Sequence, residues 1–268
     1  MTVASGAKSV RSAEHGETFH PVVGPMTEAR GLHVAESRLA ERTANGTEPF
    51  IVWDVGLGAA ANAIASLEVF AIADCSRAIE LHSFDSTPEP LEFAASHADE
   101  LGYFGEWIEP VKALLAKGEA QAGRVRWYFH RLDFRDFVRA PKGPAPHAIL
   151  YDPYSPAANP GMWTLEHFTR LRQCLAPASP CTLTSYSRST AVRVTLLLAG
   201  FFVGRGGATG EKDQTTVAAT HSELLRDPIE AEWLGRVRRS TRGGPLREGM
   251  PGGPISTEEY AALAARFR

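Results

Sequence analysis

The segment that most constrains the fold is residues 50–62, which read FIVWDVGLGAAAN. An apolar run meets an acid and then two glycines, Gly56 and Gly58, and alanines follow at once. This pattern predicts a buried strand, a tight turn and the start of a helix. Glycine has no Cβ, so a ligand can approach the backbone closely, and the start of a helix offers unpaired N–H groups. We therefore expect a nucleotide-binding corner at this turn.

Two classes of ligand bind at such a corner. Residues 56–61 fit the dinucleotide pattern GxGxxA, and Asp85 follows at the end of the next apolar run, where a ribose-binding acid is expected. Asp54 lies two residues before Gly56. A carboxylate there would repel a pyrophosphate, but it suits the cationic amino-acid end of S-adenosylmethionine (SAM). The sequence therefore favours SAM over NAD, and a glycine-rich turn that binds no ligand is the remaining alternative.

The composition bounds the class of protein. The chain has 268 residues and three cysteines, Cys75, Cys174 and Cys181. The length suits one large domain or a domain with a tail. An odd number of cysteines without metal-ligand spacing indicates neither a disulfide framework nor a metal site, so a reducing interior is expected. No apolar run reaches the roughly 20 residues of a membrane span, and the N-terminus lacks a signal core. We expect a cytoplasmic protein that binds no membrane and no metal.

Strands alternate with helices along the chain. Residues 1–18 lack apolar periodicity and predict a disordered lead-in, and residues 28–42 predict an amphipathic helix. We expect strands at residues 50–55, 79–85, 125–130, 147–152 and 181–186, then a pair at 200–203 and 215–220 that no helix joins. This order predicts a Rossmann-like, doubly wound α/β sheet of seven strands with an antiparallel last strand, the layout of class I SAM-dependent methyltransferases. The domain spans residues 19–222, and residues 223–268 form a basic C-terminal extension.

Two acids follow predicted strands at the edge where ligands bind in open α/β sheets. Asp85 ends the second strand, and its carboxylate can accept hydrogen bonds from both ribose hydroxyls; a helix N-cap is the alternative role. Asp133 follows the third strand, where SAM-binding folds commonly place an acid beside the adenine amino group. Both acids are therefore candidates for binding the cofactor.

The loop after the fourth strand carries the candidate chemistry. Residues 152–163 read DPYSPAANPGMW, with three prolines that stiffen the ligand edge. Its Asp-Pro-Tyr is similar to the Asp-Pro-Pro-Tyr loop of amino-group methyltransferases, in which a carboxylate and a backbone carbonyl orient the lone pair of an amine. This likeness favours nitrogen as the methyl acceptor, with Asp152 and Tyr154 as catalytic candidates; a turn cap is the alternative for Asp152. Further candidates for substrate contact are Pro153, Trp163, Tyr186 and Arg188. Tyr154 and Trp163 either stack on a base or serve only in packing.

A run of arginines follows the predicted domain. Residues 234–247 hold five arginines and no acid, and Arg236, Arg238 and Arg239 are candidates for binding phosphates. A flexible basic tail is the alternative. The formal net charge of −3 argues against a protein that coats nucleic acid over its whole surface, but it allows such a local patch.

The loop at residues 152–163 resembles the DGFAPxxNPxMW signature of the MnmC-type methyltransferases, which complete the methylaminomethyl group on the wobble uridine of certain tRNAs. Other segments are similar in the same order, from the arm at residues 19–28 to Ala199-Gly200-Phe201, so the resemblance covers roughly residues 19–220. It implies an N-methyltransferase that converts 5-aminomethyl-2-thiouridine in the anticodon region of tRNA, with Asp152 facing the aminomethyl nitrogen. The residues that it implies for holding SAM are Asp54, Gly56, Gly58, Asn62, Asp85 and Asp133.

The chain departs from this family pattern at three places. Ala60 replaces a glycine, which is tolerable if residue 60 already lies in the helix. Pro153 and Ser155 replace Gly and Ala beside the acceptor, and Lys212-Asp213-Gln214 replaces a more basic run. No second dinucleotide fingerprint follows, so the oxidase half of the bifunctional members is not expected. The alternatives are a SAM-dependent methyltransferase for a small amine or another nucleic-acid amino group, an NAD-dependent oxidoreductase, and a SAM-fold protein that binds without catalysing.

Overall fold

The computed structural model describes residues 1–12, 16–19, 23–44, 46–73, 77–177, 179–208, 213–250 and 252–267. Cys75, Lys212 and residues 20–22 of the arm, for which expectations were stated above, fall outside these residues. No helix within the described ranges is long and apolar enough to cross a membrane.

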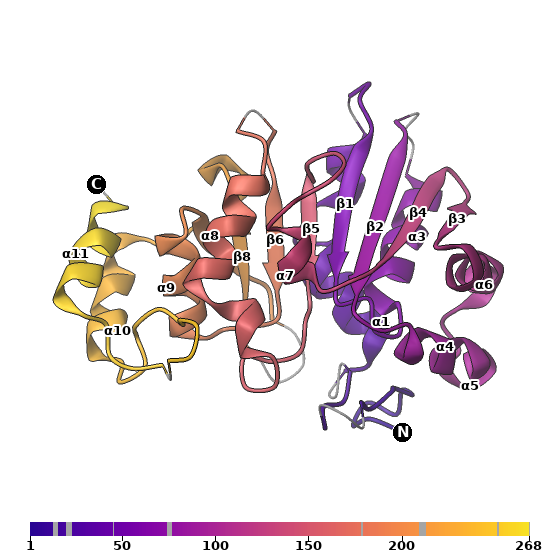
Figure 1. Cartoon of the computed structure of the whole chain (residues 1–268), viewed down its shortest axis with the longest axis horizontal. Coiled ribbons are helices and arrows are strands. Elements are labelled where there is room, and N and C mark those ends of the chain that lie inside the picture. Colours follow the sequence, from indigo (N-terminus) through magenta and orange to yellow (C-terminus); the bar gives the residue numbers. More distant parts are fainter. Residues whose placement is uncertain are drawn as a thin grey trace.

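A mixed sheet forms the centre of the described molecule, with eight strands in the order β3-β4-β2-β1-β5-β6-β8-β7 (Figure 1). Strand β8 runs antiparallel between β6 and β7, whereas β4, β2, β1, β5 and β6 are parallel. This confirms the doubly wound sheet with an antiparallel last strand. The strands are β1 (Phe50–Val55), β2 (Ile79–Asp85), β3 (Glu119–Ala122), β4 (Val125–Arg131), β5 (Ala148–Tyr151), β6 (Thr182–Ser185), β7 (Phe202–Gly206) and β8 (Thr215–Ala219).

Strand β3 is the addition to the seven expected strands. Its sequence, Glu-Ala-Gln-Ala, has no β-branched or aromatic residue, so it carries no strand signal of its own. It forms because the chain turns at Gly123, where φ is 58°, and pairs antiparallel with β4 at the edge of the sheet. The helix before it ends at Lys117, and Gly118 adopts the left-handed conformation at its C-cap.

Helices pack on both faces of the sheet, and β1 shows why. Phe50 and Val52 point into the core that α3 and α6 complete, whereas Ile51, Trp53 and Val55 point into the core of α8 and α9. The helical elements are α1 (Pro25–Glu28), the π-helix η1 (Ala29–Val34), α2 (Leu39–Thr43), α3 (Ala61–Ile72), α4 (Glu89–Ser96), α5 (Ala98–Leu101), η2 (Gly105–Trp107), α6 (Ile108–Lys117), α7 (Phe134–Phe137), η3 (Pro160–Trp163), α8 (Leu165–Cys174), α9 (Thr190–Leu198), η4 (Ser222–Leu224), η5 (Ala231–Trp233), α10 (Leu234–Arg239) and α11 (Thr257–Ala265).

The segment expected to be one amphipathic helix at residues 28–42 is divided instead. The π-helix η1 follows α1 directly, and Ala35 N–H donates to the carbonyl of Arg30 five residues back, at 3.0 Å. Arg38 then takes the left-handed conformation with φ of 54°, which ends one helical run before α2 begins. A charge pattern of helical spacing does not reveal such a break.

The C-terminal extension is packed rather than tail-like over its described residues. Trp233, Val237 and Leu263 are buried in the same core as α9. The backbone N–H of Leu246 donates to Oγ1 of Thr195 on α9 at 2.9 Å. Helices α10 and α11 therefore form a layer beside α9, next to the C-terminus (Figure 1).

Candidate active site

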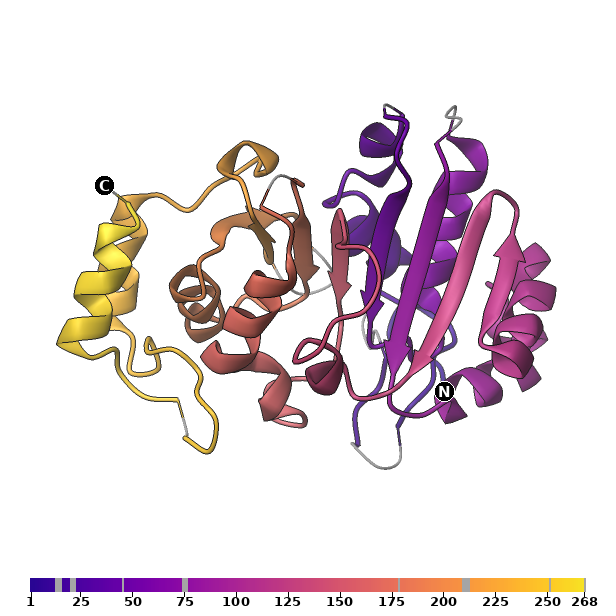
Figure 2. The same cartoon turned by 45° about the horizontal axis from the view of Figure 1, so that its top comes forward.

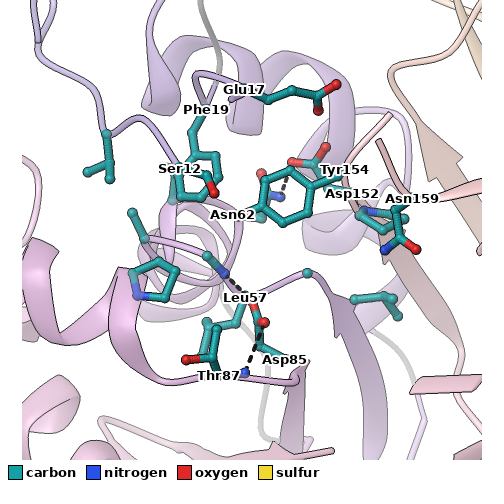
Figure 3. Close-up of a pocket in the computed structure, with 18 of the residues that line it drawn as sticks. Ser12, Glu17, Phe19, Leu57, Asn62, Asp85, Thr87, Asp152, Tyr154 and Asn159 are labelled. Carbon is teal, nitrogen blue, oxygen red and sulfur yellow. Dashed lines mark hydrogen bonds between the residues drawn. The ribbon is translucent and has the colours of Figure 1, made fainter. Parts of the chain in front are cut away.

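A pocket of about 850 Å³ opens at the carboxyl ends of β1, β2, β4 and β5. The strand order reverses between β1 and β5, and open α/β sheets bind their ligands at such a switch point. Gly58, after β1, is among the lining residues. Asp85 at the end of β2 and Asp152 after β5 also line the pocket (Figure 3). The volume is that of an ordinary small-molecule site.

The glycine turn after β1 forms one wall of the pocket. Gly56 has φ of 89°, and a Cβ there would lie 2.5 Å from the carbonyl oxygen of Asp152, so only glycine allows the two segments to approach. Gly58 has φ of 49°, and its N–H donates to Oδ2 of Asp85 at 2.9 Å. Ala60 is not yet in the helix, contrary to the expectation. It takes the left-handed conformation at φ of 64°, and α3 begins one residue later.

Asp54 lies beneath this turn and is fully buried. Its Oδ2 accepts a hydrogen bond of 2.8 Å from the hydroxyl of Ser83, which in turn accepts one of 2.9 Å from Nε1 of Trp127. Its Oδ1 has no hydrogen-bond partner among the described residues. Burial raises the pKa of Asp54 from 3.8 to about 7, and the nearby carboxylates of Asp152 and Asp85 add to the rise. The side chain of Asp54 does not line the pocket.

Asp85 and Asp133 both line the pocket, and both also cap local backbone. Besides Gly58, Asp85 accepts from the N–H of Thr87 at 3.4 Å. Asp133 is the N-cap of α7 and accepts from the N–H of Arg135 at 2.8 Å. The hydrogen bond from the Arg135 guanidinium holds the pKa of Asp133 below its usual range. The capping role and the pocket position thus coexist at each acid.

Asp152 follows β5 and is held from α3. Nδ2 of Asn62, in the first turn of α3, donates to Oδ2 of Asp152 at 2.8 Å. The side chain of Asp152 keeps 16% of its surface exposed and lines the pocket (Figure 3). The structure therefore brings together the acid and the amide that the sequence singled out from segments 90 residues apart.

The loop after Asp152 is supported from inside. Trp163 is fully buried, and its Nε1 donates to the carbonyl of Tyr154 at 2.9 Å. Trp163 does not line the pocket, so stacking on a base is not its role; it packs edge-on against Tyr186, with ring centroids 5.8 Å apart. Pro153, Tyr154 and Tyr186 do line the pocket. The hydroxyl of Tyr186 donates to the carbonyl of Pro153 at 3.4 Å, which fixes this part of the loop.

The N-terminal segment covers the pocket, which differs from the disordered lead-in expected for residues 1–18. Val10 is buried in the core beside α3, and Ser9, Ser12 and Phe19 line the pocket. Glu17 reaches the opposite wall, where its carboxylate accepts hydrogen bonds from the backbone N–H, at 3.1 Å, and the hydroxyl of Ser155. Figure 2 shows this segment beside the carboxyl ends of the central strands. The sequence gives little indication of this position, because the segment is polar and has no periodic apolar pattern.

The candidate arginines divide into separate groups. Arg188 and Arg236 line a second hollow together with Ser189, Thr190, Asp213 and Gln214. Arg238 instead lies over the ring of Tyr260, 4.7 Å from its centroid, and Arg239 is exposed at the end of α10. The described part of the chain holds no group of three or more His, Cys, Asp or Glu arranged to bind a metal ion.

Comparison with known proteins agrees with this geometry. Residues 106–221 match the model of a family described as S-adenosyl-L-methionine-dependent methyltransferase. Over this segment the chain is similar to SAM-dependent methyltransferases. The crystal structure of MnmC2 from Aquifex aeolicus is similar over 100% of this chain and 82% of that one, with a TM-score of 0.72 and 21% identity, which shows the same class I methyltransferase fold.

Curated relatives are similar over most of this chain. The tRNA 5-methylaminomethyl-2-thiouridine biosynthesis bifunctional protein MnmC of Azoarcus sp. is 29% identical over 95% of the chain and 39% of its own length. The protein of the same name from Methylibium petroleiphilum is 26% identical over 89% of the chain and 37% of its length. The chain therefore spans about two fifths of the curated relatives it matches.

Proposed function

We propose that this methyltransferase transfers the methyl group of SAM to the amino nitrogen of an aminomethyl group on the wobble uridine of tRNA, converting 5-aminomethyl-2-thiouridine to its methylaminomethyl form. The observation that carries the proposal is the position of Asp152 after β5, where it lines the pocket and is held by Asn62. The printed names of the MnmC relatives support tRNA as the substrate. A role in tRNA modification would place the protein in the cytoplasm.

The residues of the pocket fit SAM as the cofactor. The turn at Gly58 leaves backbone open to a ligand, and Oδ1 of Asp54 beneath it has no hydrogen-bond partner among the described residues. In this proposal Asp85 binds the ribose, Asp133 lies near the adenine, and Asp54 supplies negative charge toward the ammonium. When bound, SAM supplies a methyl group on a positively charged sulfur. The acidic lining favours such a cation.

Asp152 would orient the acceptor amine. Its carboxylate can accept a hydrogen bond from an amine N–H, which aims the nitrogen lone pair at the methyl group and excludes other orientations. An alkylammonium has to lose one proton before its nitrogen can attack, and a carboxylate at hydrogen-bond distance can receive that proton. Glu17 and Glu28 line the same pocket and add negative charge for a cationic substrate.

The test is methyl transfer from labelled SAM to tRNA taken from cells that lack this enzyme, followed by nucleoside analysis. We expect the wild type to convert aminomethyl-uridine to methylaminomethyl-uridine. The Asp152→Ala variant should lose about 100-fold or more in rate, because the amine is no longer oriented or deprotonated. Binding of SAM without methylation of any tRNA nucleoside would contradict the proposal.

One observation favours a second acceptor, a small-molecule amine. Glu17 bonds to Ser155 across the pocket, so the N-terminal segment limits the access of a large substrate. Salt-dependent binding of tRNA would separate the two acceptors, since only a phosphate-bearing substrate releases counterions when it binds.

A further inference from the structure

A buried histidine that the sequence did not single out lies behind Asp152. His33 has no exposed surface. Its Nδ1 lies 2.8 Å from Oγ1 of Thr184 on β6, and its Nε2 lies 3.8 Å from Oδ2 of Asp152. Nε2 has no hydrogen-bond partner among the described residues. Burying a polar atom without a hydrogen-bond partner costs folding free energy, so a functional role would explain why Nε2 of His33 lies unpaired beside the proposed acceptor site.

The local backbone places His33 there. It belongs to the π-helix η1, and short π turns inside helices occur frequently at functional sites. The segment η1 packs against α3, which carries Asn62, and against β6, which carries Thr184. The segment η1 therefore holds His33 between α3 and β6, the two elements that border Asp152. The contact of Nδ1 with the Thr184 hydroxyl sets the direction of the ring.

The hydrogen bonds favour one tautomer of His33. The Thr184 hydroxyl lies 2.8 Å from Nδ1 but 3.5 Å from the carbonyl oxygen of Ile149, which is at the outer limit for a hydrogen bond. The hydroxyl is thus better placed to donate to Nδ1. A neutral imidazole that accepts at Nδ1 carries its hydrogen on Nε2. The N–H of Nε2 then faces the carboxylate of Asp152, which is also the electrostatically favourable arrangement.

We propose that His33 is a positioning residue for Asp152. Its Nε2–H is directed at Oδ2, the same oxygen that accepts from Asn62, so two donors on different elements hold the plane of one carboxylate. The distance of 3.8 Å is longer than a hydrogen bond, and catalytic contacts of this kind commonly tighten when substrate binds. The inference rests on the proposed function, because it takes Asp152 as the group that orients the amine.

Three variants separate positioning from packing. In His33→Gln the side-chain amide reaches the place of Nε2, whereas His33→Asn reaches only the place of Nδ1, and His33→Phe keeps the ring without a polar atom. We expect kcat to fall about tenfold or more in the Asn and Phe variants and to stay within about threefold in the Gln variant, since misplacing a catalytic group by an ångström has effects of this size. The KM for SAM should stay unchanged in all three.

Equal losses in the three variants, or no loss in any, would overturn the proposal. A second readout does not need catalysis: nuclear magnetic resonance of protein labelled with ¹⁵N-histidine, compared between the wild type and Asp152→Asn. We expect the Nε2 signal of His33, assigned with the Gln variant, to shift. An unchanged signal would contradict the contact. If tRNA is not methylated but the signal shifts, the proposed function fails and the contact between His33 and Asp152 stands.

Discussion

At the scale of single residues, folding strongly changes the pKa of the Asp54 carboxyl. The pKa of its carboxyl is about 7 in the folded protein against 3.8 ordinarily, because the side chain is buried and two other carboxylates lie near. Between these pH values the folded state keeps a proton that the unfolded state releases. The contribution of Asp54 to the free energy of unfolding is therefore present at low pH and is lost as the pH rises toward 7.

Replacing Asp54 should remove this dependence. Between pH 5 and pH 8 we expect the unfolding free energy of the wild type to fall relative to that of Asp54→Asn by on the order of 3 kcal/mol. Urea unfolding at a series of pH values measures the difference. Ser83→Ala should act in the opposite direction and steepen the dependence, because the Ser83 hydroxyl favours the ionised form. Parallel curves for the wild type and Asp54→Asn would contradict the assignment.

Sequence patterns located acids and glycines of the pocket, because such residues at the ends of strands must meet at one edge of a parallel sheet. This held for Gly58, Asp85 and Asp152, which converge as expected. Trp163 could not be placed in this way, since a tryptophan in a loop reads the same whether it faces a ligand or the core. His33 depends on a π turn, for which the sequence has no periodic signal.

At the scale of elements, the N-terminal segment is the part of the pocket with the fewest constraints from the sheet. Residues 9–12 and 17–19 line the pocket, and Glu17 joins them to the loop after β5. The main elements were predictable because apolar runs and glycine stops define them. The position of the N-terminal segment over the pocket was not predictable, because its contacts are polar and join residues 138 positions apart.

Removing the Glu17 carboxylate should weaken the attachment of the N-terminal segment to the loop after β5. In Glu17→Ala we expect SAM to dissociate about five to ten times faster, which corresponds to the loss of hydrogen bonds from a charged acceptor. Stopped-flow dissociation of SAM gives the rate. Glu89→Ala is a matched control, because it removes an exposed carboxylate that lines the same pocket from α4. Equal rates for Glu17→Ala and the wild type would show that the N-terminal segment does not retain the cofactor.

At the scale of the whole molecule, an acidic pocket and a basic hollow lie close together along the chain. Tyr186 lines the pocket, and Arg188, two residues later, lines the hollow with Arg236 of the C-terminal extension. The packing of α10 on the core fixes Arg236 beside the start of α9. A substrate with a cationic amine and flanking phosphates matches this distribution of charge.

The double variant Arg188→Ala/Arg236→Ala should weaken the binding of tRNA and leave the binding of SAM unchanged. Affinity for tRNA falls as salt rises, and the steepness of log affinity against log salt counts the phosphates that the protein neutralises. We expect the magnitude of this slope to be smaller in the double variant by about one to two. Filter binding between low and moderate salt provides the slope. Lys142→Ala, an exposed positive charge in the connection into β5, serves as the control. An unchanged slope would exclude this hollow from the tRNA interface.

Strand β7 leaves the ribosome before the strand that attaches it to the sheet. Within the described chain, β7 pairs with β8 along its length, and β8 pairs in turn with β6. Until residue 219 has been added, β6 has an open backbone edge, and such an edge can pair with another polypeptide. A pause in translation after β6 has emerged from the ribosome and before β8 has done so would therefore leave the nascent chain prone to aggregation, even though the parts of the cofactor pocket have all been made by then.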